Sequence, residues 1–417
     1  MTASTSTGLR SLLAAPDAGY ESLSATYQPV FDRIGEGNLA RERAREFPYE
    51  QVRQLVDAGF SRLRIPRELG GDGATLQQLF RLLADLGAAD PNVAHIFRNH
   101  LAFVEDRLNA PEHPATEIWL DRFRRGEFVG GGWTEASNAK FGDIGTRIST
   151  VDGVTRVTGE KFYATGSLYA DWLDVIGKDA DDRLITVLVA RHQPGVTLVD
   201  DWAGFGQQTT ASGSARYRDA VVDEHGLFPA EERFAYQGLF YQTALLAVLT
   251  GIARAAFRDG AAALRRRPRN YPLGIDEVPA RDPLLQQRIG VLATRVFAAE
   301  AALEKQAATL DAVAEAHFLQ DAEAEQQALV QATVRTHEAQ TVVIEAALEV
   351  TGTVFDALGA SATAVGAGLD RHWRNARTLA SHNPRVFKER VLGDYYVNGT
   401  PPAGGSNSFL RPQGQGA

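Results

Sequence analysis

The spacing of apolar residues changes twice along this chain of 417 residues, and each change marks a different kind of structure. From about residue 20 to residue 125 the spacing is helical. In YEQVRQLVDAGFSRLRIP the apolar residues recur at steps of three and four, which predicts one buried helix face. Gly59 is expected to end that helix, and Thr75 to cap the next helix at its N-terminus.

From about residue 128 to residue 229 the spacing is typical of strands. GTRISTVDGVTRVTGEKFYAT alternates β-branched and polar residues, and Asp152-Gly153 predicts a tight hairpin turn inside it. The same strand-like pattern continues in two further segments, RLITVLVARHQPGVTLVDDW and SARYRDAVVDEHGLF. We therefore expect a β domain, barrel-like in shape, over residues 128–229.

After residue 230 the chain is helical again, with almost no helix-breaking residues between Leu284 and Leu358. Long alanine-rich helices of this kind usually pack side by side. The sequence thus predicts an α+β fold with an N-terminal helical domain (1–127), the middle β domain (128–229) and a C-terminal four-helix bundle (230–417). The Gly- and Pro-rich end of the last domain is expected to be a flexible tail.

Composition excludes several classes of function. The formal net charge of −9 argues against nucleic acid, which would require a basic face. No cysteine is present, which rules out disulfides and thiolate chemistry, and the nine histidines are dispersed, so no metal site is expected. We find no stretch of about 18 apolar residues and no signal peptide, and we expect a cytoplasmic protein that does not contact a membrane. No Gly-x-Gly-x-x-Gly follows a strand, so no nicotinamide site is expected.

Four segments, in order, resemble the acyl-CoA dehydrogenase superfamily. They are GGWTEASNAKFGDIGTRI, GEKFYATGSLYADW, DDWAGFGQQTTASGSA and LDRHWRNARTLASHNPRVFKERVLGDYYVNG. Their order and spacing hold from about residue 20 to residue 400. Within the superfamily, KFYATG, DDWAGFGQ, TTASGS and LDRHWRNARTLASHNP are most similar to the reduced-flavin monooxygenases, the branch that holds dibenzothiophene monooxygenase and the sulfur-acquisition oxidoreductases.

The dehydrogenases of this superfamily remove an α-proton with a glutamate, and this chain has none at either known position. The resemblance places Asn383 at one position and Tyr241 at the other. An amide cannot accept a proton at neutral pH, so acyl-CoA desaturation is disfavoured. The monooxygenase branch needs no such base. The alternative, an FAD-dependent acyl-CoA dehydrogenase with an unrecognised base, stays open here, as does a flavin carrier without catalysis.

The resemblance to this branch implies a two-component, homotetrameric flavoprotein. It would receive reduced FMN, or alternatively FAD, from a separate flavin reductase, and form a C4a-hydroperoxyflavin with oxygen. It would then oxygenate a small substrate, for which the resemblance implies an organosulfur compound, by S-, N- or C-oxygenation. A hydroxyl near the flavin and hydrogen-bonding imidazoles near the reacting oxygen suit that chemistry.

The residue roles follow from the same resemblance. Thr165 would supply the hydroxyl and His100 and His382 the imidazoles, as the catalytic residues. The flavin would contact Trp133, Thr134, Tyr163 and Thr165, and Arg269 would hold its phosphate across a subunit interface, since a guanidinium binds phosphate with two hydrogen bonds.

Less specific interpretations exist for each of these residues. His100 could be a core histidine, the aromatic residues could be core side chains, and Arg269 could belong to a solvated charge run. We expect His95 and His372 to be structural. This chain also departs from the branch at one position, because some members of the branch carry asparagine where this chain has Gly131.

Overall fold

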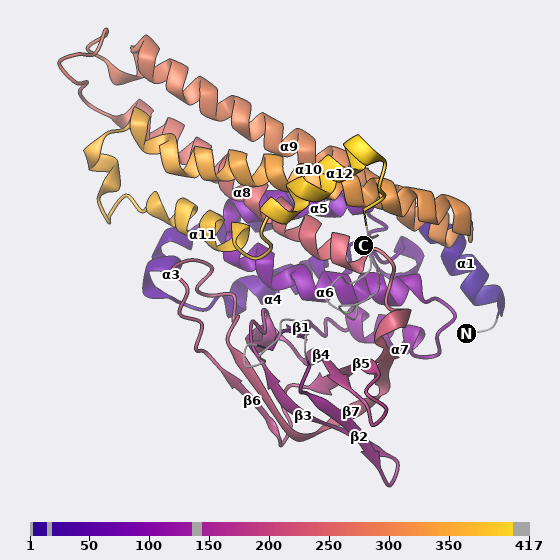
Figure 1. The fold of residues 1–417 in the computed structure, drawn as a ribbon. Coiled ribbons are helices and arrows are strands. Elements are labelled where there is room, and N and C mark those ends of the chain that lie inside the picture. Colours follow the sequence, from indigo (N-terminus) through magenta and orange to yellow (C-terminus); the bar gives the residue numbers. More distant parts are fainter. Residues whose placement is uncertain (1–2, 15–18, 136–143, 403–417) are drawn as a thin grey trace.

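The structure, a computed structural model, describes residues 3–14, 19–135 and 144–402. The expected flexible tail beyond residue 402, and the part of the TEASNAKFGD segment at 136–143, lie outside these residues. Figure 1 shows three layers, with a sheet below, short helices above it, and long helices across the top. One short helix, α6 (Pro91–Asn109), packs against both the sheet and the long helices.

The N-terminal layer is helical, as the apolar spacing predicts. Its other helices are α1 (Ala3–Ala14), α2 (Tyr20–Gly35), α3 (Asn38–Ala44), α4 (Tyr49–Ala58), α5 (Leu76–Ala89) and α7 (Ala115–Arg124). The expected stop is confirmed, because Gly59 follows α4 in the left-handed region with φ 99°. The expected cap is confirmed too: Thr75 and Gln78 form a reciprocal capping box at the start of α5.

The middle part of the sequence forms one seven-stranded sheet. Its strands are β1 (Val129–Gly132), β2 (Arg147–Val151), β3 (Val154–Lys161), β4 (Trp172–Lys178), β5 (Leu184–Ala190), β6 (Val196–Val199) and β7 (Ser214–Pro229). The order is β1-β4-β2-β3-β7-β5, and β4 also pairs with β5, which closes five strands into a ring. Asp152 and Gly153 join β2 to β3 with positive φ at both positions, which confirms the predicted hairpin.

The long helices are α8 (Gln237–Arg266), α9 (Pro283–Phe318) and α10 (Ala322–Thr353), which pack against one another. Helix α11 (Asp370–Ala380) packs against α8 and α10, and α12 (Val386–Asn398) lies on α10 with no fully buried residue. Helices α5 and α8 cross closely at Gly251, where an added Cβ would lie 2.4 Å from the Ala84 carbonyl oxygen. Helical segments before and after the strands in the sequence, with a separate sheet layer, confirm the predicted α+β fold class.

Helix α8 corrects one sequence expectation. By length and composition it could cross a membrane, with a mean hydropathy of 1.4 over its most apolar window, so an apolar stretch of that length does exist. However, 89% of that window is buried inside the protein. The apolar character of α8 is therefore explained by its position between α5, α9 and α10.

Candidate active site

Helix α6 carries three polar side chains that contact the loops of the sheet layer and the C-terminal helices. The helix begins at Pro91, and the Asp90 carboxylate caps it by accepting from the backbone N–H groups of Asn92 (3.0 Å) and Val93 (3.2 Å). His95, Arg98 and Asn99 follow at relative positions 0, 3 and 4, a spacing that places side chains on one helix face.

The orientation of His95 is fixed by a chain of hydrogen bonds from α3. The Glu42 carboxylate accepts from Asn375 Nδ2 (2.9 Å), and Asn375 Oδ1 accepts from the backbone N–H of Gln207 (2.6 Å) and from its Nε2 (3.3 Å). Gln207 Oε1 therefore faces His95 and accepts from its Nδ1 at 3.0 Å. This leaves His95 Nε2 as an unprotonated acceptor, buried and without a partner among the described residues.

Burial, with the charge of Arg98 next, lowers the pKa of His95 to about 3. At neutral pH this imidazole is therefore uncharged. Its free Nε2 is ready to accept a hydrogen bond from an O–H group, and it cannot donate one.

Arg98 lies between the second histidine and an aromatic ring. Its Nη1 is 3.4 Å from Nε2 of His382, and its guanidinium carbon is 4.7 Å from the centre of the Tyr241 ring. Burial, with the charge of Arg98 next, lowers the pKa of His382. His382 is an exposed residue, and the Arg98 cation lies directly beside its ring. Because Arg98 can only donate, the neutral His382 carries its proton on Nδ1.

Both positions at which a dehydrogenase would carry its base fall in this region. Asn383 Nδ2 donates to Gln242 Oε1 (3.2 Å), and the Asn383 carbonyl accepts from Gln340 Nε2 (2.6 Å). The pKa of Tyr241 is raised, first by burial, so its phenol stays protonated. One carboxylate, Asp174, lies near Trp133, but the paired nitrogens of Arg233 already hold both of its oxygens.

Trp133 and Thr134 follow β1 directly and lie beside this cluster. Trp133 Nε1 donates to Asp174 Oδ2 (3.1 Å), and its ring centre is 6.3 Å from that of Tyr241. The Thr134 carbonyl accepts from the Phe162 N–H (2.8 Å), which ties the end of β1 to the end of β3. Of the residues that the sequence implicates in flavin contact, Trp133 therefore lies against Tyr241, and Thr134 is the next residue in the chain.

Thr165 and Tyr163 follow β3 in the loop that faces α6. The Thr165 hydroxyl is 2.8 Å from the Ser212 hydroxyl, and the Thr165 carbonyl accepts from Asn99 Nδ2 (2.8 Å). Tyr163 is 48% exposed and has φ 56°, an uncommon backbone conformation for a bulky residue. Its ring packs at an angle against that of Trp202, with 5.8 Å between the ring centres.

The departure at Gly131 has a structural counterpart on α6. A Cβ added to Gly131 would lie 2.3 Å from Asn99 Nδ2. The absence of a side chain at Gly131 thus leaves the room that the Asn99 amide fills. An asparagine side chain is still present at this spot, supplied by the helix instead of the strand.

His100 and Arg269 lie away from this cluster. His100 is fully buried, its Nδ1 accepts from the Val129 N–H (3.1 Å), and its Nε2 donates to the Ser61 carbonyl (3.0 Å). Its ring stacks on Phe128, and both ring nitrogens are occupied by backbone groups. Arg269 is exposed in the connection between α8 and α9, where it makes no hydrogen bond or ion pair within the described residues.

Sequence reasoning missed His95, Arg98 and Gln207. One available signal was the helical phase, because His95, Arg98 and Asn99 share a face, whereas His100 is five residues from His95 and so about 140° around the helix. His372, expected to be structural, is buried and bonded through Nε2 to Asp259 Oδ2 (2.9 Å).

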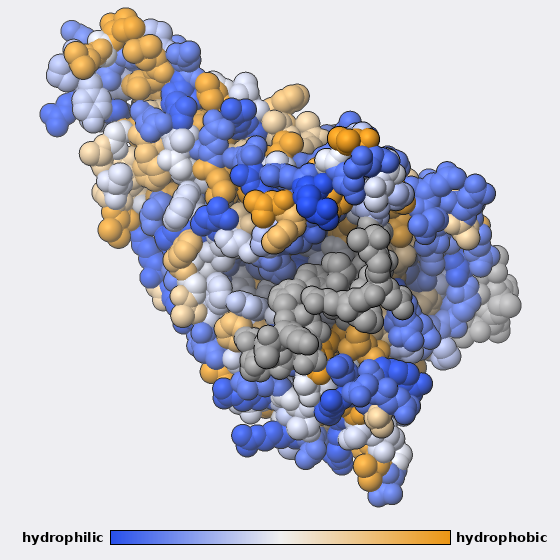
Figure 2. Space-filling view, viewed as in Figure 1, coloured by the Kyte–Doolittle hydropathy of each residue, from blue (hydrophilic) through white to orange (hydrophobic). Residues whose placement is uncertain are grey.

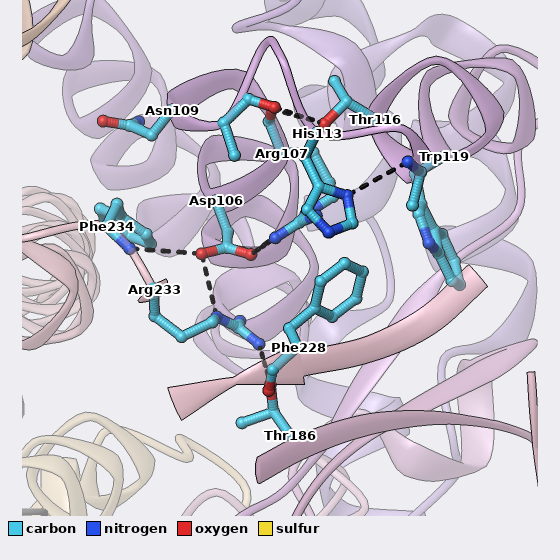
Figure 3. Close-up of polar contacts among 12 residues, drawn as sticks. Asp106, Arg107, Asn109, His113, Thr116, Trp119, Thr186, Phe228, Arg233 and Phe234 are labelled. Carbon is cyan, nitrogen blue, oxygen red and sulfur yellow. Dashed lines mark hydrogen bonds and ion pairs between the residues drawn. The ribbon is translucent and has the colours of Figure 1, made fainter. Parts of the chain in front are cut away.

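The second half of α6 carries a different set of charged groups. Asp106 accepts from Arg107 and from the Phe234 N–H, and it forms an ion pair with Arg233 at 2.9 Å (Figure 3). The guanidinium of Arg233 also donates to Asp174 and to the Thr186 hydroxyl on the sheet. Every charge in this cluster, which we call the paired cluster, has an opposite charge beside it.

Family models match the chain in two places. The acyl-CoA dehydrogenase N-terminal domain matches residues 32–126, and the acyl-CoA dehydrogenase C-terminal domain matches residues 243–385. Together these ranges cover more than half of the chain.

Individual proteins match over nearly their whole length. A probable FMNH2-dependent monooxygenase, SfnC, from Pseudomonas putida is 26% identical over 88% of this chain and 95% of that protein. A dibenzothiophene monooxygenase from Rhodococcus erythropolis is 28% identical over 89% of this chain and 92% of that protein. The crystal structure of FMN-bound TdsC from Paenibacillus sp. A11-2 superimposes with a TM-score of 0.83 at 26% identity, covering 93% of this chain and 99% of that chain.

Proposed function

The chain belongs to the acyl-CoA dehydrogenase family, and on that premise we propose that it is a monooxygenase that uses reduced FMN. It takes the reduced flavin from a separate reductase and transfers one atom of dioxygen to a small organosulfur substrate. The names of the similar proteins support this proposal, since they are monooxygenases, one FMNH2-dependent and one acting on dibenzothiophene. A fold alone would not, because one fold hosts many reactions.

The observation that carries the proposal is the chemistry of the cluster around Arg98. Both dehydrogenase base positions hold side chains that cannot take up a proton, Asn383 and a protonated Tyr241, and Asp174 is held by Arg233. In their place stand two neutral imidazoles, His95 and His382, and the Thr165 hydroxyl. This set suits hydrogen bonding to a reacting oxygen and does not suit abstraction of a proton from carbon.

The residues present fit an FMN ring. Trp133, Tyr163 and Tyr241 offer aromatic surfaces, Tyr163 with its ring half exposed, and Thr165 offers a hydroxyl beside them. The buried His95 Nε2 has no partner among the described residues, which is the state expected of an atom that bonds a ligand. Bound reduced FMN supplies two electrons, so that one atom of dioxygen reaches the substrate and the other leaves as water.

Two histidines of the chain then hold protons at defined ring nitrogens. His95 Nε2 accepts from an O–H group on the reacting oxygen, because Gln207 keeps the proton on Nδ1. His382 donates through its Nδ1–H while Arg98 occupies its Nε2. We therefore propose His95, His382 and Thr165 as the catalytic residues, and we move the role first expected of His100 to His95, since both nitrogens of His100 bond the backbone.

Isotope labelling tests the proposed function. The protein, a flavin reductase, FMN and a panel of small organosulfur compounds would be incubated under ¹⁸O-labelled dioxygen. One labelled oxygen atom per product molecule, with no product from oxidised flavin, is the expected result. Anaerobic bleaching of FAD-loaded protein by an acyl-CoA, with no labelled product, would instead establish the dehydrogenase alternative.

We also propose that the protein is a homotetramer in the cytoplasm. Apolar side chains are exposed on the α8–α9 connection, where Leu273 is 93% exposed, and on α12, where Val397 is 81% exposed. Figure 2 shows apolar residues at the upper-left end of the molecule, where that connection lies. Burial of these surfaces would bring Arg269 of one copy toward the flavin phosphate of another. Analytical ultracentrifugation of the wild type would show a tetramer, and an Arg269→Ala variant would bind FMN more weakly.

A further inference from the structure

Arg98 differs from the other arginines in the core of the protein. Arg64 lies on Glu105 with two hydrogen bonds (2.8 and 3.1 Å), Arg107 lies on Asp106, and Arg233 bridges Asp106 and Asp174. Arg98 forms no ion pair within the part of the chain that the structure describes, and its Nε is buried without a partner there.

The neighbours of Arg98 leave its charge uncompensated. His382 and His95 are neutral, Tyr241 is a protonated phenol, and Asn99 is an amide that already donates to Thr165. Burial lowers the pKa of Arg98 to about 10, so the guanidinium still carries its charge at neutral pH. A partly buried cation surrounded only by neutral groups is costly, unless a ligand supplies the opposite charge.

The position of Arg98 selects which ligand that is. The guanidinium stacks on Tyr241, whose ring meets that of Trp133, and it touches His382, so it lies among the residues assigned above to the flavin ring and the reacting oxygen. Arg98 is not expected to bind the flavin phosphate, because it lies beside Tyr241 and Trp133, the residues assigned to the flavin ring. A guanidinium fork matches two oxygen atoms that share one negative charge.

We propose that Arg98 is the anion-binding residue of the substrate site, so that the substrate is a small organic acid whose negative charge is shared by two oxygen atoms. This rests on the proposed function. The unpartnered Nε of Arg98 is one of the donors available to the acid group.

Ligand binding tests this without turnover. Methanesulfonate and dimethyl sulfone have nearly the same shape, but only methanesulfonate is charged. Calorimetric titration with each ligand, in the presence and absence of FMN, would compare the wild type with Arg98→Gln and Arg98→Lys. Arg81→Gln is the matched control, because Arg81 also stacks on a tyrosine, Tyr20 at 3.5 Å, in another part of the protein.

The expected result is that the wild type and Arg81→Gln bind methanesulfonate at least about tenfold more tightly than dimethyl sulfone. Arg98→Gln should lose about 10- to 100-fold in affinity for methanesulfonate only, and Arg98→Lys should lie between, since it keeps the charge without the fork. FMN affinity should not change in either variant.

Equal affinity of the wild type for the two ligands would overturn the proposal, and that comparison needs no variant to fold. Unchanged methanesulfonate binding by Arg98→Gln would also overturn the proposal. If Arg98→Gln lost affinity for FMN and kept its affinity for methanesulfonate, Arg98 would be assigned to the flavin instead. The isotope-labelling experiment tests the proposed function separately. If no sulfur compound gave a labelled product, the proposed function would be wrong, but the result of the ligand titration would still stand.

Discussion

Helix α6 carries charged and titratable side chains in both of its halves, and their partners differ. In the second half, Glu105, Asp106 and Arg107 are almost fully buried, and each lies beside an opposite charge. In the first half, His95 has an unused nitrogen and Arg98 has no carboxylate among the described residues. The two halves share one backbone and one hydrophobic core.

The difference separates groups that hold the fold from groups that await a ligand. Burial opposes the charge of Arg64 and Arg233, but the carboxylates beside them outweigh it and raise both pKa values. Burial lowers the pKa of Arg98, and only Tyr241 acts against it; burial also lowers the pKa of Arg107, but there the carboxylates of Asp106 and Asp174 oppose it. A protein keeps incompletely paired polar groups in its interior where function requires them. Substitutions in the two halves should therefore affect different measurements.

The largest expected effect is on stability, at the paired cluster. Asp106→Ala would leave Arg107 short of its partner and Arg233 with Asp174 alone, so we expect a loss of about 3–5 kcal/mol in the free energy of unfolding. Urea denaturation followed by circular dichroism measures it. Asp57→Ala, which removes an exposed partner of Arg53, is the control and should change stability by less than about 0.5 kcal/mol. Equal effects of the two substitutions would contradict the assignment of Asp106.

The next effect is on catalysis, at the first half of the helix. His95→Ala removes the Nε2 acceptor, and His382→Ala removes the neighbouring donor; each should lower the yield of oxygenated product by about 100-fold or more. Product formation with reductase-supplied FMN is the measurement. His192→Ala, at an exposed loop position, is the matched control. Full activity in His95→Ala would return the catalytic role to another residue.

The pH dependence of the unfolding free energy tests whether His100 is a buried, neutral residue of the core. Burial lowers its pKa from the ordinary 6.5 to about 4, so the unfolded chain binds the proton first. Stability is then fully present above pH 6.5 and falls as pH drops toward 4. The loss for this one group is at most ~1.4 kcal/mol per pH unit. The dependence of unfolding free energy on pH should be shallower by that amount in His100→Phe than in the wild type. Parallel curves for the two proteins would show that His100 titrates normally in the folded state.

The smallest expected effect is that of Arg98 on stability. Arg98→Gln breaks no ion pair with the described residues, so the free energy of unfolding should change by less than about 1 kcal/mol without ligand. Arg64→Gln, which strands Glu105 in the core, should cost about 3–5 kcal/mol in the same urea titration. A large loss in Arg98→Gln would mean that this half of α6 is structural as well.

Much of the fold could be predicted because it is encoded locally. The change of apolar spacing gave the three layers, and Gly59, Thr75 and Asp152-Gly153 act within a few residues of themselves. Residues of the candidate site could be proposed from the sequence only where the motifs are contiguous. Trp133 and Thr134 follow one strand and Tyr163 and Thr165 another, and the structure brings both loops toward α6.

The choice between His95 and His100 could not be made from local pattern. Both lie in one helix, and the partner that orients His95 is Gln207, which is 112 residues away in sequence. The partners that occupy His100, Ser61 and Val129, are 39 and 29 residues away and also lie outside the motif that suggested it. The lack of a carboxylate near Arg98 is also a property of the packed structure, because acidic residues are common in the sequence.

Stopped-flow absorbance tests the central claim most directly. The protein would be mixed with anaerobically reduced FMN and then with oxygenated buffer, without substrate. The account predicts a transient near-ultraviolet band that precedes the return of oxidised flavin, shortened in lifetime by His95→Ala and unchanged by His192→Ala. Immediate reoxidation with no transient in the wild type would contradict it, and would show that these residues do not control the reaction of reduced flavin with oxygen.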